Sequence, residues 1–296
     1  MSQLAQPLDL AGVTTGDRSR RRGPRTPVWF TIARQLFLIA FAVFAILPGV
    51  FTIFASFKGL YDFYNSPLGL PQQWQWQNYA AVWREAGIPQ AALNSFIIVA
   101  CTVPIAVLCS CCAAYGLARF RFPGNDAIYY LFLGGLVIPA QLTILPLVVL
   151  DKNVGFINTY AGLIVPYIGI HMPFDVFLLT GFLRTLPSEL RDAALIDGAN
   201  EFEVFLQITV PLLRPALATI VILNSVSIWN DFFFPMIVSP KIPVLQVGVY
   251  SLLGVYSTDW GHIFAGVVLA AIPLVAAYLL LTKQFIAGLS AGAVKG

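Results

Sequence analysis

Residues 35–57 read QLFLIAFAVFAILPGVFTIFASF, and no acidic or basic side chain interrupts them between Arg34 and Lys58. A helix needs about 20 predominantly apolar residues to cross the roughly 30 Å of hydrocarbon in a bilayer. The stretch is longer than the core of a cleavable signal peptide, about 7–15 residues. We therefore expect a retained membrane anchor here.

The composition extends this conclusion to the whole chain. Hydrophobic residues make up 58% of the 296 residues and charged residues 10%, whereas a soluble domain carries about 25% charged residues. The mean hydropathy is +0.79. These values exclude the pair of soluble domains that the length alone would suggest, and they indicate a protein with several membrane spans.

Long stretches without charge predict an all-α membrane protein with six transmembrane helices. The predicted spans cover about residues 35–57, 92–118, 127–150, 158–183, 212–234 and 260–282. Residues 1–27 form an arginine-rich tail, and residues 28–296 form the transmembrane domain. The four cysteines share one span, so we expect neither a disulfide nor a metal site among them.

The distribution of Lys and Arg sets the orientation. With the N-terminus inside, the cytoplasmic segments hold 13 of these residues and the outer loops hold 4. Positive charge is retained on the cytoplasmic side, so both termini are predicted to be cytoplasmic, in the cell (inner) membrane. The arginines at positions 18–25 are then a topology determinant, although a lipid-signalling or nucleic-acid role is an alternative. The net charge of +3 argues against nucleic acid as a partner.

The cytoplasmic segment between the fourth and fifth spans, residues 186–211, has the pattern of two short helices. Pro187 and Ser188 mark a helix start, and Gly198 is placed to end that helix with a left-handed cap. Asn200, with Glu203 three residues later, has the form of a second helix start. Pro211 is expected to end the second helix.

This helix–glycine–helix segment suits docking into a groove on another protein. Ala193 and Ala194 give it a small-residue face, and Asp192 offers a charge to a basic partner. The alternative is an amphipathic connector that lies on the lipid headgroups. The residues alone leave both possibilities open.

Asp192-Ala193-Ala194, Gly198, Ile208 and Pro211 resemble the Glu-Ala-Ala (EAA) loop of ABC importer permeases. The sugar-importing, maltose-permease branch is similar at further motifs: Asn94-Ser95, Ala113-Ala114-Tyr115, Arg119–Gly124, Ile138-Pro139, Asp197-Gly198-Ala199, Trp229-Asn230-Asp231 and Gly288–Gly296. The resemblance covers about residues 27–296. Asp192 departs from the usual Glu and shortens the carboxylate by one methylene, and Val210 replaces the usual Leu.

The resemblance implies that residues 186–211 form a coupling helix seated in a cleft of an ATP-binding subunit. It assigns the ATPase-coupling role to six residues: Asp192, Ala193, Ala194, Asp197, Gly198 and Pro211. It also implies a second homologous permease chain, two ATP-binding subunits and an extracytoplasmic solute-binding protein. ATP-driven alternating access would then carry a mono-, di- or oligosaccharide across the membrane.

The chain itself is not expected to be an enzyme. It has no G-x-x-x-x-G-K-[ST] loop to cradle nucleotide phosphates, so ATP and Mg²⁺ are expected on the partner ATPase subunits. No nucleophile–base pair or metal-ligand spacing occurs in the spans. We therefore predict no catalytic residue, no metal ligand and no cofactor on this chain.

Candidate pathway residues lie in the fifth span. Asn224, Ser227 and Asp231 are spaced i, i+3 and i+7, which places them on one helix face. Asn230 belongs to the Trp229-Asn230-Asp231 motif and is a further candidate. A sugar needs polar partners inside the membrane because unpaired polar groups are costly in hydrocarbon. The alternative is interhelical hydrogen bonding that only holds the bundle together.

Gln141 in the third span, and His171 and Asp175 in the fourth, are the remaining pathway candidates. His171 and Asp175 form an i, i+4 pair, and ionisable residues inside a membrane are functional candidates. They raise the alternative of an ion-gradient-driven secondary transporter. A membrane scaffold or receptor subunit without transport activity is a third possibility.

Overall fold

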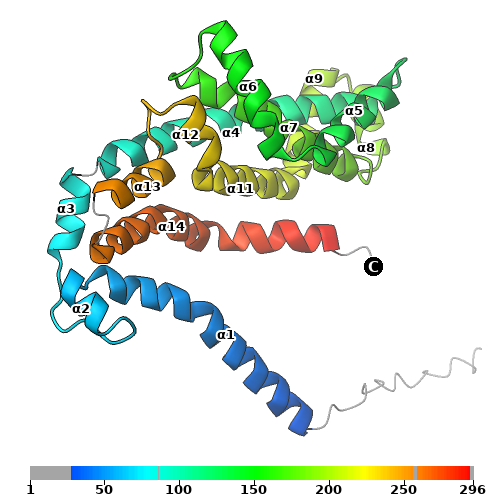
Figure 1. Ribbon diagram of the computed structural model, residues 1–296. Helices are drawn as coiled ribbons and strands as arrows, with labels where there is room; N and C mark the ends of the chain where they lie inside the picture. Colours follow the sequence, from blue (N-terminus) through cyan, green and yellow to red (C-terminus); the bar gives the residue numbers. More distant parts are fainter. Residues whose placement is uncertain (1–27, 86, 256–258, 294–296) are drawn as a thin grey trace, which may run out of the picture. The chain divides into compact units, whose positions relative to one another are not determined.

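The computed structural model describes residues 28–85, 87–255 and 259–293, and every regular element among these residues is helical (Figure 1). The helices are α1 (Val28–Ser56), α2 (Leu60–Asn65), α3 (Gln77–Glu85), α4 (Ile88–Arg119), α5 (Asn125–Val137), α6 (Ala140–Val154), α7 (Ala161–Leu183), α8 (Glu189–Ile196), α9 (Glu201–Glu203), a π-helix (Val204–Thr209), α10 (Val210–Leu212), α11 (Arg214–Asn230), α12 (Phe233–Val238), α13 (Leu245–Val255) and α14 (Trp260–Ala293). The arginine-rich tail, residues 1–27, lies outside the described residues.

Four of the described helices are long and apolar enough to cross a membrane: α1, α4, α7 and α14. Two further apolar pairs are sharply bent, α5 with α6 and the segment from α9 to α10 with α11. The total is six spans if each bent pair counts as one. The predicted all-α membrane fold is therefore confirmed.

The third predicted span, residues 127–150, is not one continuous helix. α5 and α6 meet at 105°, and Ile138 between them has extended backbone angles, φ −81° and ψ 117°. Pro139 follows directly, and the proline ring disfavours the α conformation in the residue before it. The Ile138-Pro139 pair therefore turns the chain inside the apolar region.

The fifth predicted span, residues 212–234, is also interrupted. α11 ends at Asn230, and Asp231 is extended with ψ 132° before α12 begins. In a continuous helix, Pro235 would press on the carbonyl of Asp231, four residues earlier. The break therefore leaves Asp231, which is half-buried, outside the regular helix.

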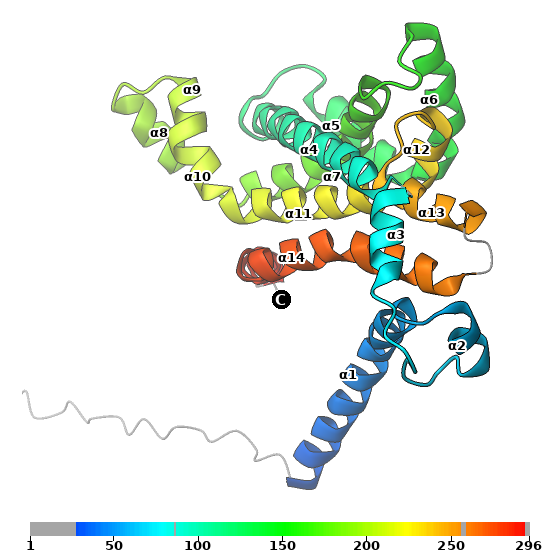
Figure 2. The ribbon, with the colours of Figure 1, turned by 90° about the vertical axis from the view of Figure 1, so that its left-hand side faces the viewer.

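The described residues fall into two compact units, which divide at Gly49–Val50. The first contains the N-terminal part of α1, whose described side chains are all exposed. In the second, α4 packs along α7, and α11 packs against both helices. Figure 2 shows α4, α7 and α11 grouped in this way, and α13 and α14 lie beside them.

Candidate coupling loop and translocation pathway

The predicted left-handed cap at Gly198 is present. Gly198 has φ +91°, its N–H donates to the carbonyl of Leu195 at 3.2 Å, and the N–H of Ala199 donates to Ala194 at 3.0 Å. These two bonds form the Schellman motif, which satisfies the last carbonyls of α8. A residue with a Cβ is strained at this φ, so the backbone conformation favours glycine here. Steric contact does not require it, because nothing lies within 4 Å of an added Cβ.

The second helix of the loop begins as the sequence predicts. The Asn200 side chain accepts hydrogen bonds from the N–H groups of Phe202 and Glu203, each at 3.0 Å. The Glu203 carboxylate accepts from the N–H of Asn200 at 2.8 Å. This is a complete capping box.

The prediction that Pro211 ends this helix is wrong. The chain continues as a π-helix to Thr209 and as α10 to Leu212, and it turns by 73° only at the junction with α11. In a regular α-helix, Pro211 would collide with the carbonyl of Gln207. The wider π-helix that precedes the proline accommodates it, so the bend falls two residues later.

The surface of the loop carries most of the predicted coupling residues. Asp192, Ala193, Asp197 and Gly198 are exposed, and Ala194 and Pro211 are half-buried. Two large apolar side chains that were not predicted stand beside them. Ile196 is 85% exposed and Phe202 is 68% exposed.

Asn224 and Asp175 form one buried pair between α11 and α7. The Asn224 amide Nδ2 donates to Asp175 Oδ2 at 2.7 Å, and their side chains are almost fully buried. The other carboxylate oxygen, Asp175 Oδ1, has no hydrogen-bond partner in the described part of the chain. The pair therefore joins two helices and does not face an open space.

Four other candidates line one small cavity of about 200 Å³: Gln141, His171, Ser227 and Asp231. Tyr167 also lines it, and its hydroxyl donates to Asp231 Oδ2 at 2.8 Å. His171 Nδ1 lies 2.8 Å from the Tyr167 carbonyl. The cavity thus combines polar groups with aromatic rings.

Asn230 lies apart from this cavity. Its amide donates to the Val226 carbonyl at 3.0 Å, and its oxygen accepts from Gln246 at 3.4 Å on an exposed surface. Tyr167 lines the cavity but was not among the predicted pathway residues. The i, i+4 spacing of Tyr167 and His171 on one helix was the available signal.

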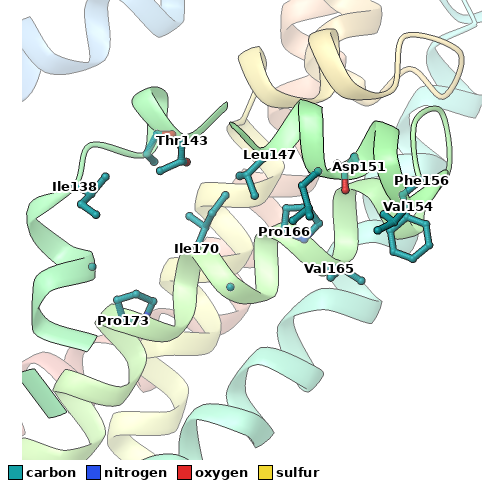
Figure 3. A pocket seen from close by; sticks show the side chains of 14 residues that line it. Ile138, Thr143, Leu147, Asp151, Val154, Phe156, Val165, Pro166, Ile170 and Pro173 are labelled. Atoms are coloured by element: carbon teal, nitrogen blue, oxygen red, sulfur yellow. Dashed lines mark hydrogen bonds between the residues drawn. The ribbon is translucent and has the colours of Figure 1, made fainter. Parts of the chain in front are cut away.

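A larger pocket of about 510 Å³ lies among α5, α6 and α7 (Figure 3). Most of its lining is apolar, including Ile138, Leu147 and Pro166. Asp151 is the one acidic residue in the lining, is 2% exposed, and its Oδ2 has no partner among the described residues. A single carboxylate among apolar walls does not offer the several polar groups that a sugar requires.

Comparison with known proteins decides the family. Residues 88–290 match the family model described as binding-protein-dependent transport system inner membrane component. The chain belongs to this family. It is therefore a multi-pass membrane protein and a transport permease.

Two relatives share most of the permease's length. The chain is 36% identical over 267 residues to the diacetylchitobiose uptake system permease protein NgcG of Streptomyces coelicolor, covering 89% of this chain and 88% of the relative. It is 34% identical over 278 residues to the melibiose/raffinose/stachyose import permease protein MelC of Bacillus subtilis, covering 93% of this chain and 100% of MelC.

A solved structure shares the fold of the permease. A chain in the crystal structure of a bacterial ABC transporter that imports the acidic polysaccharide alginate matches with a TM-score of 0.78 and 21% identity. The match covers 88% of this chain and 98% of that chain. The arrangement of helices described above is therefore shared with a chain of that ABC transporter.

Proposed function

We propose that this permease is a membrane-spanning subunit of an ATP-driven importer of a sugar, and that α8, Gly198 and α9 form its coupling loop. The exposed, self-capped loop is the observation that carries the proposal. Its helix ends are satisfied by its own residues, yet Ile196 and Phe202 leave large apolar side chains uncovered. An exposed apolar surface framed by polar residues is typical of a protein interface.

The proposal assigns this interface to an ATP-binding subunit. The chain lacks a phosphate-cradling loop, so two partner subunits would bind ATP and Mg²⁺. A second permease chain would complete the pathway, and a solute-binding protein would deliver the sugar from outside. The family description supports the binding-protein partner.

The sugar class is inferred from the relatives and the cavity. NgcG is named for diacetylchitobiose, and MelC is named for melibiose, raffinose and stachyose. The cavity lined by Gln141, His171, Ser227 and Asp231 offers hydrogen-bonding groups beside the Tyr167 ring. At about 200 Å³ it is smaller than the roughly 300–1,000 Å³ of a typical ligand site. We propose that it is one wall of a pathway whose other wall belongs to the second permease chain.

Purification in mild detergent tests the proposed assembly. We expect the tagged permease to co-purify with an ATP-binding protein and a second permease, and the complex to hydrolyse ATP. Recovery of the chain alone, without ATPase activity, would contradict the proposal.

A matched pair of variants tests the loop itself. Ile196→Asp should lose the ATP-binding subunit, because Ile196 is 85% exposed on the loop. Leu68→Asp is the control, because Leu68 is 86% exposed on the predicted outer side. Equal retention of the ATPase by both variants would count against the loop as the docking site.

A further inference from the structure

Helix α4 is bonded at both ends to loops that are distant in sequence. It contains 32 residues from Ile88 to Arg119, and at 1.5 Å per residue it is about 48 Å long, enough to cross the whole bilayer. Between its ends it packs along α7 and α11. The two ends are therefore joined by one helix that is supported along its length.

At the predicted cytoplasmic end, α4 contacts the coupling loop through a buried tyrosine. The Tyr115 hydroxyl donates to Glu201 Oε2 at 2.8 Å, and the Tyr115 ring packs edge-on against Phe205 with centroids 5.1 Å apart. Tyr115 is only 6% exposed. The contact therefore joins the first residue of α9 to the last turns of α4.

Arg191 extends this contact to α8. Its guanidinium makes an ion pair with Glu201 and also donates through Nε to Oε2 at 3.3 Å. Partial burial raises the pKa of the Glu201 carboxyl, but the hydrogen bonds from Arg191 and Tyr115 outweigh this and hold that pKa below its usual range. Glu201 is thus a charged bridge between α8 and α4.

At the predicted outer end, α4 holds the segment between α12 and α13. The Asn94 amide donates to the Pro243 carbonyl at 2.9 Å, and the Ser95 hydroxyl oxygen accepts from the N–H of Leu245 at 2.8 Å. Asn94 and Ser95 are both buried. About 20 residues, or roughly 30 Å of helix, separate this contact from Tyr115.

We infer that α4 relays movement between the coupling loop and the outer segment 239–245, with Tyr115 and Glu201 as positioning residues at the cytoplasmic end. The inference rests on the proposed function, because it requires an ATP-binding subunit that moves α8. Coupling between two sites is reciprocal in binding free energy. A relay of this kind therefore lets ATP binding inside change the outer segment, and lets a protein bound outside change the affinity for ATP.

The test measures the outer end while ATP acts at the inner end. Lys241 is exposed in the outer segment, so Lys241→Cys is introduced into the purified complex reconstituted in vesicles. The rate at which a membrane-impermeant maleimide modifies it is measured with and without ATP and Mg²⁺. We expect ATP to change this rate, and no knowledge of the transported sugar is needed.

Two variants then interrupt the proposed relay. Tyr115→Phe removes only the hydroxyl, and Glu201→Gln keeps an acceptor but removes the charge. Residues that carry coupling change it by about 0.5–2 kcal/mol, so the ATP-dependent change in rate should fall roughly 2- to 30-fold. Both variants should elute from a size-exclusion column at the same volume as the wild-type complex, which excludes simple misfolding.

Tyr129→Phe is the matched control. Tyr129 lies on α5, and its ring contacts the Arg184 guanidinium at 4.8 Å, a contact that phenylalanine preserves. The control should respond to ATP as the wild type does.

Each other outcome has one meaning. A complex that hydrolyses ATP but whose variants respond fully, or whose wild type does not respond at position 241, overturns the relay and leaves the proposed function standing. A wild type with no ATP-binding partner overturns the proposed function, and the relay with it.

Discussion

The coupling loop and the Asp175–Asn224 pair are two polar regions that differ in burial and in the source of their hydrogen bonds. The loop satisfies its own backbone through the Schellman motif at Gly198 and the capping box at Asn200, and it leaves apolar side chains exposed. The Asp175–Asn224 pair is buried, and one hydrogen bond between its side chains joins two helices. The helix caps of the loop are formed by residues close in sequence, whereas the hydrogen bond of the pair depends on tertiary packing.

This difference separates two kinds of role. A locally stable loop can be displaced by a partner without unfolding, which suits a coupling element. Removing the donor from a buried carboxylate that has only one lowers the stability of the fold. Such a contact suits an element that holds two helices together. Single substitutions in each region separate these two roles.

Gly198→Val should abolish coupling. A β-branched residue in the left-handed region costs about 1–2 kcal/mol and would redirect α9 relative to α8. We expect at least a tenfold loss of ATP-driven transport, measured in vesicles at equal amounts of permease. Gly155→Val is the control, because Gly155 has φ +77° and open space around it at the end of α6. A similar loss in both variants would mean that the loop has no special role.

Asn224→Ala should destabilise the bundle by about 2–3 kcal/mol, because it leaves the buried Asp175 carboxylate without its donor. Thermal unfolding in detergent measures this change. Asn230→Ala, on an exposed surface, should change stability by less than about 0.5 kcal/mol. If Asn224→Ala is equally mild, the pair does not hold α7 to α11.

Tyr167→Phe should have a smaller effect, about 1 kcal/mol, because it removes one hydrogen bond to Asp231. If the cavity lies on the sugar pathway, the KM for transport should also change while ATP hydrolysis without substrate stays constant. An unchanged KM together with the loss of stability would assign Tyr167 to packing alone.

The smallest effect concerns pH. The pKa of Glu201 is lowered in the folded chain, so its contribution to stability is complete above the unfolded value of about 4.3 and is lost as pH falls. We expect no effect of this group between pH 6 and 8. Below about pH 4.5 the wild type should lose more stability than Glu201→Gln, as followed by thermal unfolding. A steeper loss in Glu201→Gln would contradict the bridge between Arg191 and Tyr115.

The sequence predicts the features that depend on local chemistry. Uninterrupted apolar stretches locate the long helices, and Gly198 and Asn200 locate the two helices of the loop because a cap is formed by residues close in sequence. The family resemblance rests on the same segments. The loop residues could therefore be named before any coordinates, although their contact with an ATPase stays a prediction.

The missed features depend on contacts between distant residues. Asn224 bonds Asp175 across 49 positions, and the i, i+3, i+7 pattern placed it instead on one face with Ser227 and Asp231. The 105° break at Ile138-Pro139 could not be told from a proline that a helix tolerates, such as Pro104 within α4. Tertiary packing determines whether a proline breaks the helix and which helix a polar side chain contacts. The periodicity of the sequence contains no information about that packing.

Sugar uptake into vesicles separates ATP from an ion gradient as the energy source of the permease. The complex is reconstituted with its binding protein, and uptake of raffinose- and chitobiose-type sugars is followed with ATP inside, with and without an ionophore. We expect uptake that requires ATP, survives the ionophore and persists in Asp175→Asn. Uptake that proceeds without ATP and is abolished by the ionophore or by Asp175→Asn would contradict it.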